Sequence, residues 1–337
     1  MESHVWINFL VFVLIASAGL VVWAVRRSRF WREQLAEVGR RRRVSTFVLA
    51  LFMLIALADS ISWTSQSDDV GLMEPRSLID RVFPEDFRER TYSQPLSDIE
   101  FYGGEPLKYP ARHLLGTDIL GRDVLLMTLK GSKIALLIGG LTSAIAIPLA
   151  LLLGVSAGYY GRRVDDFVVF LITTLSSMPS ILLLTALIVA LGRGPVQVCI
   201  ALAITGWVGL CRVVRGETLK LRELDYVRAA RALGVSEFSI ILRHIVPNLL
   251  HLVVITFVLM FSGLVLSEAI LSWLGIGIDG SWGQMIDQAR DELSRDPIIW
   301  WNLGAASLAL FILVLCVNLV GDAIRDVLDP RTAKEGM

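Results

Sequence analysis

The stretch Ile134–Tyr160 reads IALLIGGLTSAIAIPLALLLGVSAGYY and contains no Asp, Glu, Lys, Arg or His. A run of about 18 or more apolar residues is long enough to cross a hydrocarbon core of roughly 30 Å. Lipid offers the backbone no hydrogen-bond partners, so only helices and closed barrels span it, and this stretch lacks the alternation of a barrel strand. It therefore predicts a membrane-spanning helix.

The rest of the chain contains more runs of the same kind. Of its 337 residues, 54% are hydrophobic and 19% are charged, whereas a soluble domain carries about a quarter charged residues. The predicted spans are Val5–Val25, Val44–Trp63, Ile134–Tyr160, Phe167–Leu191, Val196–Cys211, Ile245–Leu266 and Ile298–Val320. We therefore expect an all-α integral membrane protein, a polytopic helix bundle with about seven spans.

The first run, Val5–Val25, differs from a cleaved signal peptide in two ways. No basic region precedes it, and arginines follow it in place of a small-residue cleavage site. A retained anchor whose N-terminus lies outside is the better interpretation. The run carries no charge and no G-x-x-x-G pair, so we expect it to lie at the edge of the bundle.

The charges of the loops predict the orientation. Residues 26–43 contain eight arginines against two glutamates, and residues 212–243 contain seven Lys or Arg against four acids. Residues 64–112 contain ten acids against six Lys or Arg, and residues 276–297 contain five acids against two arginines. Because basic loops stay in the cytoplasm, the first two segments are predicted inside and the last two outside. The N-terminus is then outside and the C-terminus is cytoplasmic.

Several classes of function lack their motifs in this sequence. The net charge is zero, so no overall field favours nucleic acid or an acidic substrate. The sequence has no phosphate-binding G-x-x-x-x-G-K-[S/T] loop, no H-E-x-x-H motif, no nucleophile elbow and no histidine pair at metal spacing. Cys199, Cys211 and Cys316 fall inside apolar runs and are predicted to be small core residues. We therefore expect no catalytic site and no metal site in this chain.

The loop before the sixth predicted span contains two helix signals. It reads LDYVRAARALGVS from Leu224 to Ser236. Asp225 is predicted to cap a short helix that Gly234 ends in a left-handed conformation, and Ser236 to cap a second helix. Ala229 and Ala230 give the short helix a small-residue surface that can lie in a groove of a partner. The alternative is an ordinary surface helix-turn-helix between two spans.

This loop resembles the EAA loop of permease subunits of binding-protein-dependent ABC importers. The run Ala229-Ala230-x-x-x-Gly234, ending in Val246-Pro247, carries the resemblance. The sequence departs from the motif at three positions, with Arg228 in place of Glu, His244 in place of Ile and Val246 in place of Leu. No acidic role is therefore assigned to the first motif position.

Further segments are similar to one branch of that family, the C-type permeases for dipeptides, oligopeptides and nickel. The motif His113–Val124 resembles the signature of this branch, and its residues are Gly116, Thr117, Asp118, Gly121, Arg122 and Asp123. The other similar segments are Gly158–Asp165, Leu274–Gly275, Ser281–Gly283 and Gly321–Arg331. The resemblance covers roughly residues 110–331, so Val5–Val25 looks like an additional helix.

The resemblance implies the transmembrane domain of a type I ABC importer and a permease that is not itself an enzyme. The expected partners are a homologous B-type permease, two ATP-binding subunits, an extracytoplasmic substrate-binding protein and the lipid of a bacterial inner membrane, with no nucleic acid. ATP and Mg²⁺ would bind to the ATPase subunits, so this chain would hold no cofactor. The residues expected to couple to those subunits are Asp225, Tyr226, Arg228, Ala229, Ala230 and Gly234.

The expected organisation has three parts. Residues 1–43 form the additional helix and a basic loop, and residues 44–133 form the first family-type span with an extracytoplasmic segment. Residues 134–337 form the permease core, which includes the coupling loop 212–246.

The Gly116–Asp123 motif is predicted to be an interfacial elbow that positions the next span. We expect a turn and then an amphipathic helix, with Asp118 and Asp123 in its opening turn, where acids suit the helix dipole. Contact with a partner protein would be a secondary role.

Three more residues within or near the predicted spans stand out. Glu268 is either a gate or pathway residue, because ionisable groups at membrane depth are functional candidates, or a residue of the water interface. Pro148 and Pro179 are expected to kink their spans.

Two other classes of membrane protein would need features beyond a bundle of membrane helices. A secondary transporter would need paired ionisable residues in mid-span and discontinuous helices in two repeats. A membrane-embedded enzyme would need a clustered nucleophile or metal set. The sequence shows neither pattern. Within the ABC branch, peptides, nickel chelates and other small solutes all remain open as substrates.

Overall fold

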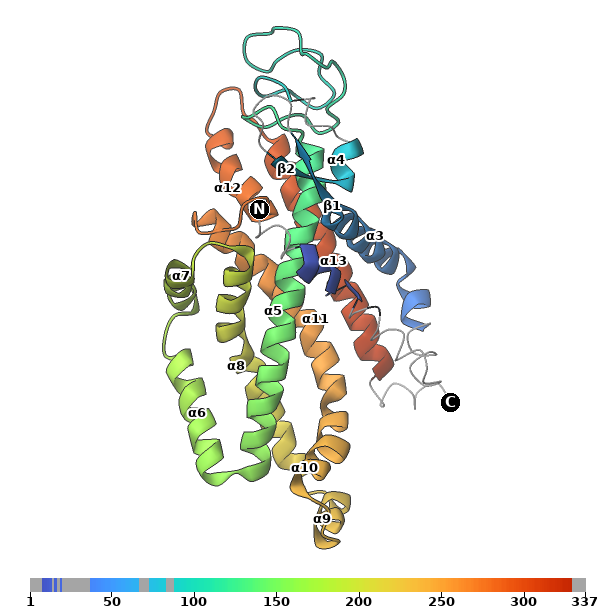
Figure 1. Cartoon of the computed structure of the whole chain (residues 1–337), viewed down its shortest axis with the longest axis vertical. Helices are drawn as coiled ribbons and strands as arrows, with labels where there is room; N and C mark the ends of the chain where they lie inside the picture. The colour runs from blue at the N-terminus through green and yellow to red at the C-terminus, as the bar shows by residue number, and fades with distance from the viewer. Residues whose placement is uncertain are drawn as a thin grey trace. The chain divides into compact units, whose positions relative to one another are not determined.

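The structure is a computed structural model that describes residues 8–13, 15, 16, 19, 37–66, 73–82 and 88–328. Most of this part of the chain is helical (Figure 1). Its helices and strands are α3 (Arg43–Ser60), β1 (Ser62–Gln66), β2 (Met73–Ser77), α4 (Leu78–Val82), α5 (Val124–Tyr160), α6 (Arg162–Ser176), α7 (Ser180–Leu191), α8 (Pro195–Leu221), α9 (Asp225–Ala232), α10 (Glu237–Ile240), the π-helical turn η2 (Ile241–Ile245), α11 (Val246–Trp273), α12 (Trp282–Leu293) and α13 (Trp301–Leu328). The predicted helical fold class is confirmed, with one short hairpin added.

The chain divides into two compact units. Unit 1 contains Met1–Gly139 and Val265–Val320, and unit 2 contains Gly140–Leu264 and Gly321–Met337. The helices α5, α11 and α13 each contribute residues to both units.

Five helices of the described residues are long and apolar enough to cross a membrane. They are Arg43–Ser60, Val124–Tyr160, Pro195–Leu221, Glu237–Trp273 and Trp301–Val327. Each contains most or all of a predicted span, but α5 begins at Val124 rather than Ile134, and α8 ends at Leu221 rather than Cys211. The extra turns carry the charged side chains that ended the apolar runs, which a helix tolerates where those side chains reach the interface.

The predicted span Phe167–Leu191 is broken. The helix α6 ends at Ser176, Pro179 precedes α7, and the two helices are bent by 91° at the break. Pro179 lacks a backbone N–H, and a proline disfavours helical geometry in the residue before it. The kink expected at Pro179 is therefore a complete interruption, whereas Pro148 lies inside the continuous α5.

The first predicted span, Val5–Val25, lies largely outside the described residues. Those described within it are helical, and one of them makes a polar contact with α5. The ammonium group of Lys133 donates a hydrogen bond to Asn8 Oδ1 over 2.5 Å, and Val11 is buried. Asn8 is uncharged and belongs to no G-x-x-x-G pair, so the pattern behind the predicted edge position gave no sign of this contact, and the edge position stays a prediction.

The hairpin formed by β1 and β2 was not predicted. Its strands are antiparallel, with Ser62 opposite Ser77. The helix α4 follows directly, and Asp80 accepts hydrogen bonds from the backbone N–H and the hydroxyl of Ser77 over 2.8 and 3.0 Å. Asp80 also forms an ion pair with Lys130 of α5, which ties this segment to unit 1.

Two glycines bring α5 and α8 into close contact in unit 2. A Cβ atom at Gly154 would lie 2.9 Å from the carbonyl oxygen of Cys211, and one at Gly158 would lie 2.7 Å from that of Arg215. This is the small-x-x-x-small arrangement by which membrane helices approach each other. The buried core around it includes Ala150, Trp207, Leu210 and Val214.

Candidate functional site

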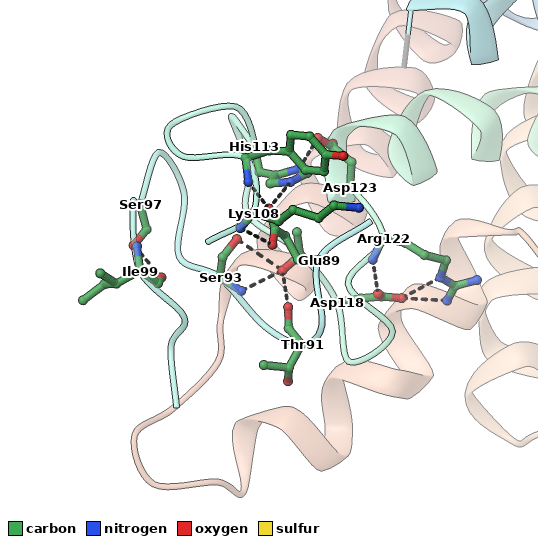
Figure 2. Close-up of polar contacts among 12 residues, drawn as sticks. Glu89, Thr91, Ser93, Ser97, Ile99, Lys108, His113, Asp118, Arg122 and Asp123 are labelled. Carbon is green, nitrogen blue, oxygen red and sulfur yellow. Dashed lines mark hydrogen bonds and ion pairs between the residues drawn. The ribbon is translucent and has the colours of Figure 1, made fainter. Parts of the chain in front are cut away.

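The Gly116–Asp123 motif of unit 1 forms a turn (Figure 2). The Asp118 carboxylate is fully buried and accepts hydrogen bonds from the backbone N–H groups of Leu120 and Arg122 over 3.0 and 2.8 Å. Its other oxygen pairs with the Arg122 guanidinium, with the Nη2 atom at 2.7 Å. The predicted turn is confirmed, but Asp118 belongs to it and not to the opening turn of a helix, because its side chain satisfies these donors within the turn.

Asp123 ends the motif and begins α5. Its Oδ1 atom accepts hydrogen bonds from the N–H groups of Leu125 and Leu126 over 2.8 and 3.1 Å, which is the arrangement of a helix N-cap. Its Oδ2 atom lies 2.9 Å from Nδ1 of the buried His113. One carboxylate thus fixes both the start of α5 and the segment before it.

Thr117 connects three parts of the chain. Its hydroxyl accepts a hydrogen bond from Ser93 N–H over 2.7 Å and donates to the Thr91 carbonyl over 2.8 Å. Its own carbonyl accepts a hydrogen bond from the Trp301 indole over 2.9 Å, at the start of α13. Thr117 therefore joins the 88–123 segment to α13.

The glycines of the motif are required by both conformation and space. Gly116 has φ +75° and Gly121 has φ +68°, a region that side chains disfavour. A Cβ atom at Gly116 would overlap the carbonyl oxygen of Ser93, and one at Gly121 would overlap that of Glu89. All six predicted motif residues thus belong to one packed structure.

Glu89 belongs to this structure although the sequence did not single it out. Its carboxylate is buried and accepts hydrogen bonds from the backbone N–H groups of Lys108 and Tyr109 over 2.9 and 2.8 Å. It also lies 3.6 Å from Nε2 of His113.

A second buried polar cluster of unit 1 contains Glu292 of α12. Its Oε1 atom accepts hydrogen bonds from the Tyr92 hydroxyl over 3.2 Å and from the Asn302 amide over 3.3 Å. Burial raises the pKa of Glu292, against the opposing effect of these two donors. Burial and the neighbouring Glu292 raise the pKa of Tyr92 to about 12.

Glu268 lies in the last turns of α11, where it is 4% exposed. Its Oε1 atom accepts a hydrogen bond from the Ser272 hydroxyl over 2.6 Å. Ser272 lies 3.4 Å from the hydroxyl of Ser281, which caps α12 by accepting from Gln284 N–H over 3.1 Å. Glu268 thus belongs to a buried polar cluster with Ser272, and its two interpretations, a gate or pathway residue and a residue of the water interface, stay predictions.

The helix α9 of unit 2 is the short helix predicted in the loop after α8. Figure 1 shows it beyond α10, at the lower edge of the view. The N-cap residue is Leu224, so the predicted cap at Asp225 is wrong by one position. Asp225 is the first helical residue, where its negative charge suits the helix dipole.

Gly234 ends α9 as predicted. Its φ is +77°, its N–H donates to the Arg231 carbonyl over 3.0 Å, and Val235 N–H donates to the Ala230 carbonyl over 3.1 Å. This hydrogen-bond pair is the Schellman motif of a helix end with a left-handed residue. Ser236 is the N-cap residue of α10, as predicted, but its side chain makes no capping hydrogen bond.

The two sides of α9 differ in burial. Val227 is fully buried, and Ala230 packs against the same core. Ala229 is exposed, so the two alanines of the motif lie on different sides. Tyr226 and Leu233 are 44% and 84% exposed, and Phe238 of α10 is 70% exposed. Within the part of the chain that the structure describes, these large apolar side chains on and beside α9 are thus left exposed.

The charges beside α9 pair with one another. Arg228 Nη2 lies 2.6 Å from Glu223, and Arg222 Nε lies 3.1 Å from the same carboxylate. The hydrogen bonds from Arg228 and Arg222 hold the pKa of Glu223 below its usual range. Arg228 occupies the first position of the family motif, where the family has a glutamate. The acidic side chain beside it is Glu223, which precedes α9.

Tyr226 connects α9 with the helix that follows. Its hydroxyl accepts a hydrogen bond from the Asn248 amide over 3.2 Å, and its ring centroid lies 6.0 Å from that of His244. His244, which departs from the family motif, thus contributes to the packing of α9 against η2.

Residues 150–334, which include α9 and its Gly234 end, match the family model described as the binding-protein-dependent transport system inner membrane component. The chain belongs to this family.

Curated proteins of the family share most of the chain. A peptide transport system permease protein of Brucella abortus is 41% identical over 228 residues, which is 66% of this chain and 75% of the relative. The oligopeptide transport system permease protein OppC of Haemophilus influenzae is 36% identical over 65% of this chain and 70% of its own. The dipeptide transport system permease protein DppC of Bacillus subtilis is 33% identical over 66% of this chain and 69% of its own.

A solved structure supports the fold. An inward-facing structure of the MetNI methionine ABC transporter superposes with a TM-score of 0.50 at 19% identity, over 61% of this chain and 98% of that chain. The fold is that of an ABC importer transmembrane domain, as the sequence resemblance implied.

The cysteines of this family member are structural. Cys199, Cys211 and Cys316 are all buried, which confirms the prediction of small core residues. Within the described ranges, no group of three or more His, Cys, Asp or Glu side chains is arranged to hold a metal ion.

Proposed function

We propose that this chain is the C-type permease subunit of an ATP-driven peptide importer. It would form the translocation pathway with a homologous B-type permease. Two ATP-binding subunits would bind ATP and Mg²⁺ and hydrolyse the nucleotide, and a substrate-binding protein would deliver the peptide outside. The relatives are named as permease proteins of peptide, oligopeptide and dipeptide transport systems, and these names support peptides as the substrate class.

One observation carries the coupling role, namely the short helix α9 with its uncovered apolar neighbours. A helix of this size can lie in a groove of an ATPase subunit. The exposed Tyr226 and Leu233 would enter that contact, and the Gly234 turn would fix its shape. The contact residues on this surface would be Asp225, Tyr226, Arg228, Ala229, Ala230 and Gly234. To transmit energy, α9 must bind the two states of the ATPases with unequal affinity.

The Gly116–Asp123 motif is proposed to position α5 rather than to bind substrate. Its carboxylates are used internally, Asp118 within the turn and Asp123 at the start of α5. Its surface would contact the binding protein or the B-type permease as a secondary role. Glu268 is proposed to fix the loop between α11 and α12 at the outer gate, through Ser272.

The proposed topology places the N-terminus outside and the C-terminus in the cytoplasm of a bacterial inner membrane. The loop charges support this orientation. In this organisation residues 1–43 are the additional helix and basic loop, and residues 44–133 are a span with the extracytoplasmic segment. Residues 134–337 are the permease core, with the coupling loop 212–246 inside the cell.

A nickel chelate or another small solute is the alternative cargo, because the branch that this chain resembles includes permeases for nickel as well as for peptides. Purification of the chain with its partners, followed by mass spectrometry of what the binding protein carries, distinguishes these substrates. We expect peptides on the binding protein and ATP hydrolysis that the loaded binding protein stimulates. A chain that purifies without ATPase subunits and transports along an ion gradient would instead be a secondary transporter.

A further inference from the structure

Tyr159, the penultimate residue of α5, lies against α9 and α10, which form the proposed coupling segment. Its side chain is buried, and its hydroxyl donates a hydrogen bond to the Glu237 carboxylate at the start of α10. Arg231 of α9 lies on the same group, with its guanidinium carbon 5.2 Å from the centroid of the Tyr159 ring. The Nε atom of Arg231 lies 3.6 Å from the Glu237 carboxylate. One aromatic side chain of α5 therefore contacts both short helices of the segment.

The end of α5 that carries Tyr159 is fixed to α8. Gly158 packs on the α8 backbone, and the Arg222 guanidinium donates to the Gly158 carbonyl over 2.9 Å. The guanidinium thereby satisfies an acceptor at the C-terminal end of α5 and complements its dipole. Asp165, in the first turn of α6, pairs with Arg215 of α8 through two contacts, one of them at 2.7 Å. These contacts join α5, the start of α6 and α8 into one body at this end.

The other described contacts of α9 differ in what they can transmit. Arg228 pairs with Glu223, which precedes α9 in the same loop, and both groups are exposed to solvent. Val227 packs into the core through apolar contacts, which have no direction and permit sliding. Tyr226 contacts Asn248, which follows α9 along the chain. The contact at Tyr159 is a charge-assisted hydrogen bond and joins α9 and α10 to a helix distant in sequence.

We propose that Tyr159, Arg231 and Glu237 form the positioning link through which a displacement of α9 reaches the joined ends of α5 and α8. This inference rests on the proposed coupling of α9 to ATPase subunits. Arg231 and Glu237 hold the tyrosine from the two sides of the α9–α10 turn, so that α9 and the end of α5 move together. Loss of the link leaves α9 free to follow the ATPases without moving the bundle.

The test uses the full complex of both permeases and both ATPases in proteoliposomes, with the binding protein and trialanine as the probe. Tyr159→Phe keeps the ring and removes the hydroxyl. We expect the ratio of peptide transported to ATP hydrolysed to fall about tenfold. The loss of a hydrogen bond to a charged group changes an equilibrium constant by about this factor. Tyr160→Phe is the matched control, because it removes the hydroxyl of the neighbouring residue of α5, which is 52% exposed, and it is expected to retain the wild-type ratio.

Two further measurements separate a link from a merely structural contact. Glu237→Gln keeps an oxygen acceptor for Tyr159 but removes the charge beside Arg231, and we expect a smaller loss of the ratio than with Tyr159→Phe. The double variant Tyr159→Cys with Glu237→Cys, joined by a short bifunctional thiol reagent, is expected to transport, because a covalent bridge replaces the link.

The outcomes distinguish this inference from the proposed function. If the loaded binding protein stimulates no ATP hydrolysis by the wild-type complex and no peptide is imported, the proposed function is wrong. If the wild-type complex transports and Tyr159→Phe keeps its ratio, only the link is wrong. If the bridged double variant assembles but stops transport, α9 and α5 must move apart in the cycle, and the link is wrong as well.

Discussion

The ammonium group of Lys133 in α5 lies 3.2 Å from the carboxylate of Asp59 in α3, and these side chains are 12% and 9% exposed. Removing one member of a buried ion pair leaves the other charge without compensation. We therefore expect Asp59→Asn to destabilise the protein by about 3 kcal/mol or more. Thermal unfolding in detergent measures this loss. The double variant Asp59→Leu with Lys133→Met is expected to recover most of it.

The same lysine tests the packing of the first helix. Asn8→Ala removes one acceptor of Lys133 but leaves Asp59 in place, so a loss of about 1 kcal/mol is expected. A loss as large as that of Asp59→Asn would mean that the first helix, and not α3, holds the lysine. That result would overturn the expectation that Val5–Val25 lies at the edge of the bundle.

Gly104 and Gly121 have the same backbone angle but different surroundings, so they distinguish the cost of the left-handed conformation from the cost of steric overlap. Gly121 and Gly104 both have φ +68°, but a Cβ atom would overlap the Glu89 carbonyl at Gly121 and meets nothing within 4 Å at Gly104. Gly104→Ala should cost only the left-handed conformation, about 1–2 kcal/mol. Gly121→Ala should cost roughly a further 1–3 kcal/mol for the overlap. Equal unfolding temperatures for the two variants would contradict the packed motif.

Gly234 provides a test of the proposed coupling role of α9. Its φ is +77° and a Cβ atom there would meet nothing within 4 Å. A substitution therefore acts only through the strain of the backbone conformation. Gly234→Val should abolish most transport, because a β-branched residue disfavours this conformation. Gly234→Asn should retain transport, because Asn tolerates it. Uptake by proteoliposomes measures both, and wild-type uptake by Gly234→Val would exclude the coupling role of this turn.

The buried Glu292 predicts how stability depends on pH. Its pKa is raised by burial in the folded state, so the fold favours the protonated acid. Stability is then fully present below the ordinary glutamate pKa and falls as pH rises through the raised value. Thermal unfolding between about pH 4 and pH 8 should show this decline, and Glu292→Gln should flatten it. If the stability of Glu292→Gln declines by the same amount, another titratable group causes the pH dependence.

The topology can be tested at exposed positions of each side. Asp98 and Ser236 are both exposed and lie on loops predicted to face opposite sides of the membrane. In intact cells, an impermeant thiol reagent should label Asp98→Cys and not Ser236→Cys. Labelling of both to the same extent would contradict the proposed orientation.

Local patterns in the sequence predict a large part of this structure. Apolar runs locate the membrane helices because the hydrocarbon core imposes a minimum length on each. Gly234 was predictable for a similar reason, since a helix end with a left-handed residue has a compositional preference within a few positions.

The contacts that sequence reasoning missed join residues far apart in the chain. Tyr92 and Glu292 are 200 positions apart, and no pattern within a helix or loop predicts that they meet. Asp118 was expected in the opening turn of a helix because an acid before an apolar run is also a common helix start. The close approach of Gly154 to α8 depends on a partner helix whose face the sequence does not identify.

The break at Pro179 limits what can lie beside unit 2. An acyl chain offers neither a donor nor an acceptor, while the first turn of α7 begins with N–H groups that no preceding turn can satisfy and no side chain caps. Ser177 and Met178, beside the proline, are exposed in this chain. At membrane depth, a second polypeptide or water molecules would therefore have to supply the hydrogen-bond partners that lipid cannot.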